Sequence, residues 1–195
     1  MKDKKSEIFD CGKDLFSRNG FKVTNVSDIT KMAGIGTGTF YKYYTSKEEL
    51  FMDIYLEENE KLKRSIMESV PAGADPIELI KGIIKKNLEG MKANPILKEW
   101  YNRDLFSKIE KEFYKSDGIK SIHEIMNGST FELIKLWRSE GKLRNDIDDD
   151  MILAIFNAIP YIDIHKEELG IQYFPLILEY LAEFIMKGLM DRKKK

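Results

Sequence analysis

A short stretch near the amino terminus gathers side chains that suit contacts with nucleic acid. The hydroxyls of Tyr41 and Tyr43 and the ammonium of Lys47 are hydrogen-bond donors of the kind that contact phosphate oxygens. Helix starts near Thr24 and Gly36 would add backbone donors, because the first turn of a helix leaves its N–H groups unpaired. These residues predict a surface that binds phosphates.

Residues lying among these donors have types that can read base edges. Lys42 can donate to a guanine, and Thr37 and Thr39 can meet a thymine methyl or a base acceptor. Phe40 and Tyr44 are four residues apart, so they share one face of a helix and are expected to point into a core rather than toward a partner.

Residues 24–51 have the pattern of two short helices, a turn between them and the start of a third helix. Thr24 is of a type favoured as a helix N-cap, and Gly34 can take the left-handed conformation that stops a helix. A second short helix is predicted over residues 36–44, and residues 45–49 hold a cap followed by acids. Two short helices joined by a glycine turn form a helix-turn-helix, whose second helix enters the major groove of DNA.

The run GIGTGTFYKYYTSKEEL, residues 34–50, resembles the DNA-binding signature of the TetR/AcrR family of bacterial transcriptional regulators. The resemblance covers roughly residues 6–55 and begins with a helix predicted over residues 6–19. The chain differs from the usual family pattern at two positions. Gly36 replaces a polar residue, often Ser, and Thr30 replaces Ala.

The resemblance implies specific contacts and a specific activity. Thr24, Tyr41, Tyr43 and Lys47 match family positions that commonly touch phosphates. It also implies a ligand-responsive transcriptional regulator, most simply a repressor, that binds double-stranded DNA as a homodimer. Two identical heads related by a twofold axis would read a roughly palindromic operator.

Composition bounds the possible classes of protein. The chain has 195 residues, of which 43% are hydrophobic and 33% charged, as in soluble globular proteins. Its net charge of −1 excludes a uniformly basic surface, so DNA affinity must come from local placement of charge. The single cysteine, Cys11, excludes an intrachain disulfide and suits a reducing cytoplasm, and a packing role is favoured over redox sensing. No apolar run approaches the roughly 18 residues that indicate a membrane span.

Helical periodicity continues through the chain and predicts an all-α fold. Residues 1–46 are expected to form a three-helix DNA-binding head. Residues 47–195 are expected to form a helical bundle for ligand binding and dimerisation, which are the roles that the resemblance implies. This bundle begins with a connector helix over residues 47–70, and the run PAGADP at residues 71–76 ends that helix. Further helices are predicted over residues 76–93, 96–116, 119–140, 151–164 and 173–190.

The last two predicted helices, residues 151–164 and 173–190, are apolar on more than one face. Such helices must be covered by two neighbours or by another chain. In the family that the head resembles, the last two helices form the dimer interface. Burial within one monomer remains the alternative.

The middle of the chain is rich in large aromatic residues, which can line an apolar cavity. The resemblance implies a pocket there for a small apolar or aromatic effector. Aromatic residues at helical spacing more commonly fill a core, and that interpretation stays open for each of them. The candidate pocket residues are Trp100, Tyr101, Phe106, Phe113, Trp137, Phe156 and Tyr161.

Other chemistries have weaker support in the sequence. His123 and His165 lack metal-ligand spacing, and the acids at residues 146–150 are explained by a helix start, so neither a metal nor a cofactor is predicted. GIGTG superficially suggests a phosphate loop, but no strand precedes it and no lysine follows in place. The chain shows no nucleophile elbow or other catalytic frame, which argues against an enzyme. A helical interaction module that does not bind DNA is the second rival.

Overall fold

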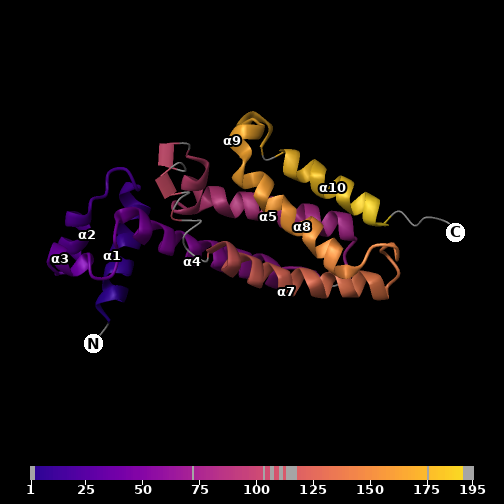
Figure 1. Ribbon diagram of the computed structural model, residues 1–195, viewed down its shortest axis with the longest axis horizontal. Helices are drawn as coiled ribbons and strands as arrows, with labels where there is room; N and C mark the ends of the chain where they lie inside the picture. Colours follow the sequence, from indigo (N-terminus) through magenta and orange to yellow (C-terminus); the bar gives the residue numbers. More distant parts are fainter. Residues whose placement is uncertain are drawn as a thin grey trace. The chain divides into compact units, whose positions relative to one another are not determined.

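The computed structural model describes residues 3–71, 73–102, 104–105, 108–109, 112, 118–174 and 176–190, and these contain helices but no strand. The predicted all-α fold is confirmed (Figure 1). The helices and 3-10 helices (η) are α1 (Lys4–Asn19), α2 (Val26–Met32), α3 (Thr37–Phe40), α4 (Lys47–Glu68), α5 (Pro76–Ala93), η1 (Leu97–Tyr101), α7 (Gly118–Ser139), α8 (Asp149–Ile164), α9 (Lys166–Leu169), η2 (Ile171–Tyr173) and α10 (Leu176–Met190).

The chain divides into two compact units. Unit 1 comprises residues 1–62 and 90–122, and unit 2 comprises residues 63–89 and 123–195. The long helices α4, α5 and α7 each contribute residues to both units. This packing division differs from the expected functional boundary after residue 46, which stays a prediction.

Three phenylalanine rings form the centre of the amino-terminal head in unit 1. The ring centroids of Phe16 and Phe21 are 5.6 Å apart, and the ring of Phe51 lies 5.3 Å from the first and 5.0 Å from the second. All three are buried, so α1, the turn after it and the start of α4 share one core. Phe40 and Tyr44 are buried too, which confirms that they face inward.

The N-cap of α2 is Asn25, so the prediction that Thr24 caps this helix is wrong. The carboxylate of Asp28 accepts a hydrogen bond from the Asn25 backbone N–H at 3.0 Å, which closes the first turn. The Thr24 hydroxyl is buried instead and donates to the carbonyl oxygens of Gly20 at 2.9 Å and Leu15 at 3.3 Å. Thr24 and Asn25 are both of residue types that commonly cap helices. The turn after α1 places the Thr24 hydroxyl against the end of that helix instead.

The second helix of the pair is shorter than predicted. The prediction covered residues 36–44, but α3 ends at Phe40 and a turn follows, in which the Tyr43 N–H donates to the Phe40 carbonyl at 2.9 Å. Gly34 has a φ of 63° and ends the preceding helix, as predicted. Thr30, which departs from the family pattern, is accommodated in the core because its hydroxyl donates to a backbone carbonyl one turn earlier.

Helix α4 begins with the cap that the sequence indicated. The Ser46 hydroxyl accepts the Glu49 N–H at 3.0 Å, and the Glu49 carboxylate accepts the Thr45 hydroxyl at 2.7 Å. The helix ends at Glu68, two residues before the predicted end at residue 70. The predicted connector helix is therefore present.

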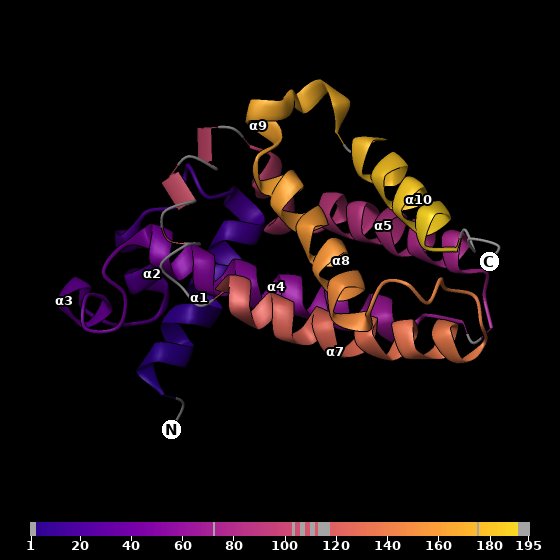
Figure 2. The ribbon, with the colours of Figure 1, turned by 45° about the vertical axis from the view of Figure 1, so that its right-hand side comes forward.

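Unit 2 has its own apolar core, and α8 and α10 are in contact in it (Figure 2). Helical spacing explains why one face of each helix contributes to this core. The cap of α5 at Asp75 and that of α8 at Asp148 confirm the predicted helix starts, since each carboxylate accepts a backbone N–H of the first turn. The buried residues of this core are Leu79, Ile80, Ile134, Trp137, Leu143, Ile152, Ala182, Met186 and Leu189.

The predicted continuous helix over residues 96–116 is wrong. The 3-10 helix η1 ends at Tyr101, and Asn102 has an extended backbone with φ −86° and ψ 105°. Asn94 fixes the start of η1, because its Oδ1 accepts the N–H groups of Ile96 at 2.8 Å and Leu97 at 3.2 Å. The short elements α9 and η2 were not predicted, and the last helix begins at Leu176 rather than near residue 173.

Candidate nucleic-acid interface

The predicted DNA-contacting side chains fall into an exposed group and a group whose polar atoms bond within the protein. Tyr41 is 56% exposed and Tyr43 is 38% exposed, and Lys42 between them is exposed as well. The buried Phe40 ring packs edge-on against the Tyr41 ring at 5.3 Å and supports it from inside. The three residues therefore present two hydroxyls and an ammonium outward from a rigid base, which suits phosphate and base-edge contacts.

The start of α3 adds small polar groups to this exposed set. Gly36 and Thr37 are exposed, and Thr39 is half-buried. No atom from another part of the described chain lies within 4 Å of the position that a Cβ would occupy at Gly38, so this part of the α3 surface is free of neighbouring protein atoms. The surface formed by residues 36–43 is called the α3 surface below.

Thr24 is buried and Lys47 is half-buried, and the polar atoms of both bond within the head. The Lys47 ammonium donates to the backbone carbonyls of Phe21 at 2.9 Å and Thr24 at 2.8 Å, and it lies 4.2 Å from the centroid of the Phe21 ring. Burial lowers the pKa of Lys47 below its usual value, Lys108 acts in the same direction, and Glu48 opposes both. Lys47 thus ties α4 to the turn between α1 and α2, and its donors are directed at protein carbonyls.

We expect Lys47→Ala to change the stability of the protein and Lys42→Ala to change its DNA binding. Lys47→Ala should lower the free energy of unfolding by about 1.5–3 kcal/mol, the range for hydrogen bonds to a charged group, and leave the salt dependence of DNA binding unchanged. Lys42→Ala should leave stability within about 0.5 kcal/mol and reduce the salt slope by about one unit. Urea denaturation and DNA titrations at several salt concentrations measure both. A reduced salt slope for Lys47→Ala with unchanged stability would place Lys47 on a phosphate instead.

A second tie, which the sequence did not predict, joins the end of the helix-turn-helix to α4. The Tyr44 hydroxyl donates to the Asp53 carboxylate at 2.9 Å. Lys5 from α1 lies 3.8 Å from the same carboxylate and 5.4 Å from the centroid of the Tyr44 ring. Burial raises the pKa of Tyr44, and the negative charge of Asp53 raises it further. Tyr44 therefore positions the exposed residues before it.

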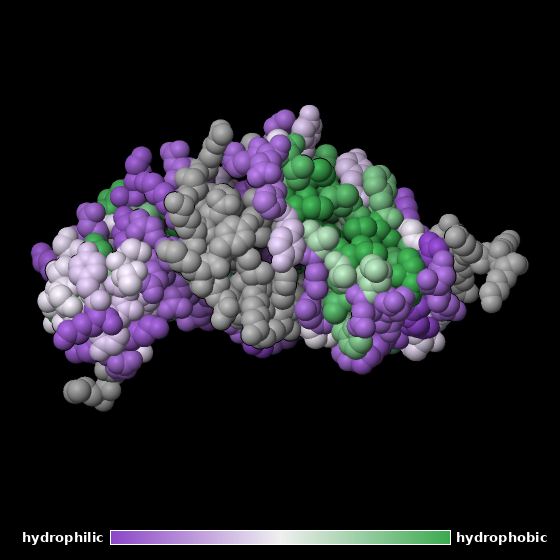
Figure 3. Space-filling model, in the orientation of Figure 1, coloured by the Kyte–Doolittle hydropathy of each residue, from purple (hydrophilic) through white to green (hydrophobic). Residues whose placement is uncertain are grey.

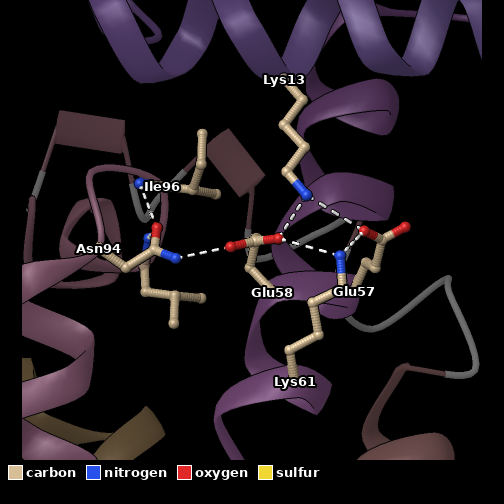
Figure 4. A network of polar contacts seen from close by, with 7 residues as sticks. Lys13, Glu57, Glu58, Lys61, Asn94 and Ile96 are labelled. Atoms are coloured by element: carbon tan, nitrogen blue, oxygen red, sulfur yellow. Dashed lines mark hydrogen bonds and ion pairs between the residues drawn. The ribbon is translucent and has the colours of Figure 1, made fainter.

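An ionic network connects α1, α4 and the end of α5 within unit 1 (Figure 4). The Lys13 ammonium lies 2.5 Å from a Glu58 oxygen and 3.2 Å from a Glu57 oxygen. Lys61 pairs with both glutamates from the next turn of α4. The Asn94 side-chain amide donates to the other Glu58 oxygen at 2.7 Å. Glu58 is thus the residue at which α1 and the start of η1 are both held to α4.

We expect Glu58→Gln to lower the free energy of unfolding by about 2 kcal/mol at pH 7, because it weakens charge-assisted hydrogen bonds to a largely buried group. Burial acts to raise the pKa of Glu58, but the hydrogen bonds from Lys13 and Asn94 outweigh it and hold the pKa below 4.5. A lowered carboxyl pKa contributes stability above the ordinary pKa and loses it as the pH falls through the folded pKa. The difference between the variant and the native protein should therefore shrink below pH 4.5.

The control for this prediction is Glu68→Gln, which changes an exposed glutamate on the same helix. Chemical denaturation at neutral and acidic pH should show almost no effect of Glu68→Gln at either. An equal loss of stability for both variants, or a Glu58→Gln effect that does not vary with pH, would contradict a structural role for the network.

The candidate pocket residues divide between the two units. In unit 1, Trp100 is buried and stacks on Tyr55 with centroids 5.3 Å apart, and the Tyr101 hydroxyl lies 3.8 Å from the Met91 sulfur. In unit 2, Trp137 is buried in the core, Phe156 packs against that core, and Tyr161 is 44% exposed. The exposure of Tyr161 places it at the surface rather than around an interior cavity. Phe106 and Phe113 lie outside the described residues.

Two buried side-chain amide oxygens lack a hydrogen-bond donor among the described residues, and the sequence did not predict them. Asn59 is 5% exposed, and its Nδ2 donates to the Tyr55 hydroxyl at 3.3 Å. Its Oδ1 has no donor among the described residues, and the same holds for Oδ1 of Asn127 on α7. Buried acceptors without donors are uncommon and mark places where a ligand or water hydrogen can bind.

Among the acids at residues 146–150, Asp148 caps α8, as the helix-start interpretation predicted, and two others form ion pairs. Asp146 pairs with Arg144 at 2.5 Å, and Asp149 pairs with Arg138 at 2.6 Å. The described residues contain no group of three or more His, Cys, Asp or Glu side chains that could hold a metal ion. Within the same part of the chain, no helix has the length and apolar character needed to cross a bilayer.

Comparison with known proteins identifies the head. Residues 8–54 match the family profile described as "Bacterial regulatory proteins, tetR family". The HTH-type transcriptional repressor KstR2 of Mycolicibacterium smegmatis is 18% identical over 184 residues, which cover 90% of this chain and 89% of the relative.

Two solved structures share the fold. RolR in complex with resorcinol has a TM-score of 0.66 at 14% identity, and the match covers 95% of this chain and 87% of that one. FadR from Bacillus subtilis in complex with stearoyl-CoA has a TM-score of 0.52 at 19% identity, covering 95% and 97%. The helix-turn-helix geometry and the matching profile agree, and KstR2 and FadR are described as a transcriptional repressor and a transcriptional regulator. The amino-terminal head, residues 8–54, therefore matches the tetR family of bacterial regulatory proteins, and the chain as a whole shares the fold of RolR and FadR.

Proposed function

We propose that the protein is a ligand-responsive repressor that binds a palindromic operator as a homodimer. The observation that carries the DNA-binding part is the α3 surface, in which Tyr41, Lys42 and Tyr43 are exposed directly after a buried ring. We assign phosphate contacts to the two tyrosines and to backbone groups near Gly36. We assign base contacts to Lys42, Thr37 and Thr39. Thr24 and Lys47 hold the helix-turn-helix in place.

The proposed dimer is supported by an apolar surface on the last helices of unit 2. Tyr180 is 51% exposed and Phe184 is 61% exposed, and their rings stack with centroids 5.9 Å apart. Figure 3 shows a broad hydrophobic area over the region of α8 and α10. Contiguous exposed apolar area of this kind marks an interface, since water contact with it is unfavourable. Other exposed apolar residues of these helices and the adjoining turns are Met151, Tyr161, Leu169, Tyr173 and Leu176.

A second copy of the chain is the proposed partner for this surface. Helix α10 lies within the expected interface segment 173–190, and α8 covers the expected segment 151–164 and begins two residues before it. A twofold dimer presents the same patch from each subunit and places two heads on one duplex.

The proposed effector is a small molecule with an apolar body, bound in the helical domain. Fold relatives that bind resorcinol and stearoyl-CoA support such a site. A ligand that binds one conformation better shifts the protein toward it. We propose that binding displaces α4, which carries the Lys47 and Glu58 ties to the head, and thereby changes the spacing of the two α3 surfaces.

The experiment measures stoichiometry and release on a single duplex. Two chains should bind one palindromic duplex, and a half-site duplex of equal length should bind far more weakly. Resorcinol and stearoyl-CoA serve as the first release probes, each added to the preformed complex. Equal affinity for the palindrome and the half-site would contradict dimeric recognition.

A further inference from the structure

A half-buried lysine of unit 2 has an amide, and not a carboxylate, as its hydrogen-bond partner. Lys63 lies on α4, and its half-buried side chain directs its Nζ to the Asn87 Oδ1 on α5 at 2.5 Å. That oxygen belongs to a neutral amide. No carboxylate of the described residues lies within 4.0 Å of the Lys63 ammonium, whereas the half-buried Lys13 of unit 1 pairs with two glutamates.

Packing around Lys63 reduces the hydration of its ammonium, and no carboxylate in the described part of the chain contacts the ammonium in return. Burial lowers the pKa of Lys63 to about 8 from 10.5, and the more distant Asp163 on α8 only partly opposes this. Lys166 is also buried, and its ammonium donates to the Asp163 backbone carbonyl at 3.2 Å. The Lys166 ammonium is therefore held at the end of α8. A partly dehydrated ammonium such as that of Lys63 costs free energy unless an anion joins it.

We propose that Lys63 and Asn87 form the polar end of the effector site and bind the carboxylate of an acidic small molecule. Lys63 would donate a charge-assisted hydrogen bond to the carboxylate, and Asn87 would keep the ammonium oriented toward it. The inference rests on the proposed ligand-responsive function and specifies the chemical class of the effector: an apolar body with one anionic group. Lipid-like acids and aromatic acids share this chemistry.

The position of Lys63 in the helix matters as well as its charge. Lys85 on α5 is an exposed lysine of the same unit, and it gives a matched control. A solvated lysine neutralises a ligand weakly because water and salt screen it, whereas a dehydrated one interacts strongly. Lys63→Met removes the charge and keeps a flexible apolar stem of similar length.

The test compares pairs of probes that differ only in charge. Decanoate is paired with decanamide, and benzoate with benzamide, and binding to the full-length protein is measured by calorimetry without DNA. The acid of at least one pair should bind the native protein about tenfold or more tightly than its amide, as expected for a contact of about 1.4 kcal/mol. Which pair responds distinguishes a lipid-like effector from an aromatic one.

Lys63→Met should abolish the preference for the acid, and Lys85→Met should keep it. In the absence of any probe, Lys63→Met should melt at the same temperature as the native protein or higher, because the ammonium has no ion pair to lose. The proposal is overturned if acids and amides bind the native protein equally, if neither binds, if the preference survives in Lys63→Met, or if that variant melts at a clearly lower temperature. Operator binding by Lys63→Met, measured separately, reports on the proposed function, so the two failures can be told apart.

Discussion

Replacing Tyr180 and Phe184 together with glutamate (Tyr180→Glu, Phe184→Glu) will convert the protein to a monomer and lower its operator affinity by about two to four orders of magnitude. The two rings are exposed and stacked on α10, so the substitutions add charge to the proposed interface without disturbing the buried face of that helix. Burying four carboxylates across a twofold axis is unfavourable. The affinity loss follows from losing the second head, because linkage of two binding modules raises overall affinity by about 10²–10⁴-fold.

The matched control is Leu136→Glu, which places the same charge on another exposed apolar residue of unit 2. It should remain dimeric and bind the operator normally. Light scattering after gel filtration gives the mass of each variant, and circular dichroism checks that helical content is unchanged. A double variant that stays dimeric at low micromolar concentration would exclude the Tyr180 and Phe184 surface as the dimer interface.

Phe51→Ala will unfold or severely weaken the DNA-binding head. Phe51 has no exposed surface, and its ring contacts those of Phe16 and Phe21 at 5.3 and 5.0 Å. Truncating a buried phenylalanine costs about 3–5 kcal/mol, a large share of the roughly 5–15 kcal/mol that stabilises a typical domain. Phe51→Leu, which preserves most of the volume, should cost less than about 1.5 kcal/mol.

A comparison with Tyr41→Ala separates folding from recognition. Tyr41 is 56% exposed, so its removal should reduce DNA affinity while leaving the denaturation midpoint nearly unchanged. Phe51→Ala should lower both, and its DNA binding should recover partly at reduced temperature as the head refolds. Normal stability of Phe51→Ala in urea denaturation would contradict the role assigned to the three-ring core.

Local sequence signals predicted the parts of the fold that local physics determines. Apolar residues three and four apart located the long helices, and the acids at residues 146–150 marked a helix start, where the Asp148 carboxylate accepts a first-turn N–H group. Gly34 adopts a φ value of 63°, which other residues rarely take. The inward orientation of Phe40 and Tyr44 followed from their spacing.

Contacts between distant residues could not be predicted in this way. Thr24 and Asn25 are both of types favoured as a helix N-cap. Only the packing of α1 against α2 shows that Asn25 is the N-cap of α2. Lys47 finds its carbonyl acceptors 23 and 26 residues away, so nothing in its neighbourhood distinguishes it from a lysine that binds phosphate. Lys63 likewise resembles a solvated residue until the fold places Asn87 beside it.

Recognition of DNA by the α3 surface can be tested by selection from a pool of random duplexes, followed by sequencing, at two salt concentrations. We expect enrichment of a palindrome with two equal half-sites, with affinity that falls steeply as salt rises because phosphates are neutralised. Lys42→Ala should relax the preference at one position in each half-site. Recovery of no enriched sequence, together with binding that does not depend on salt, would contradict DNA recognition by the α3 surface.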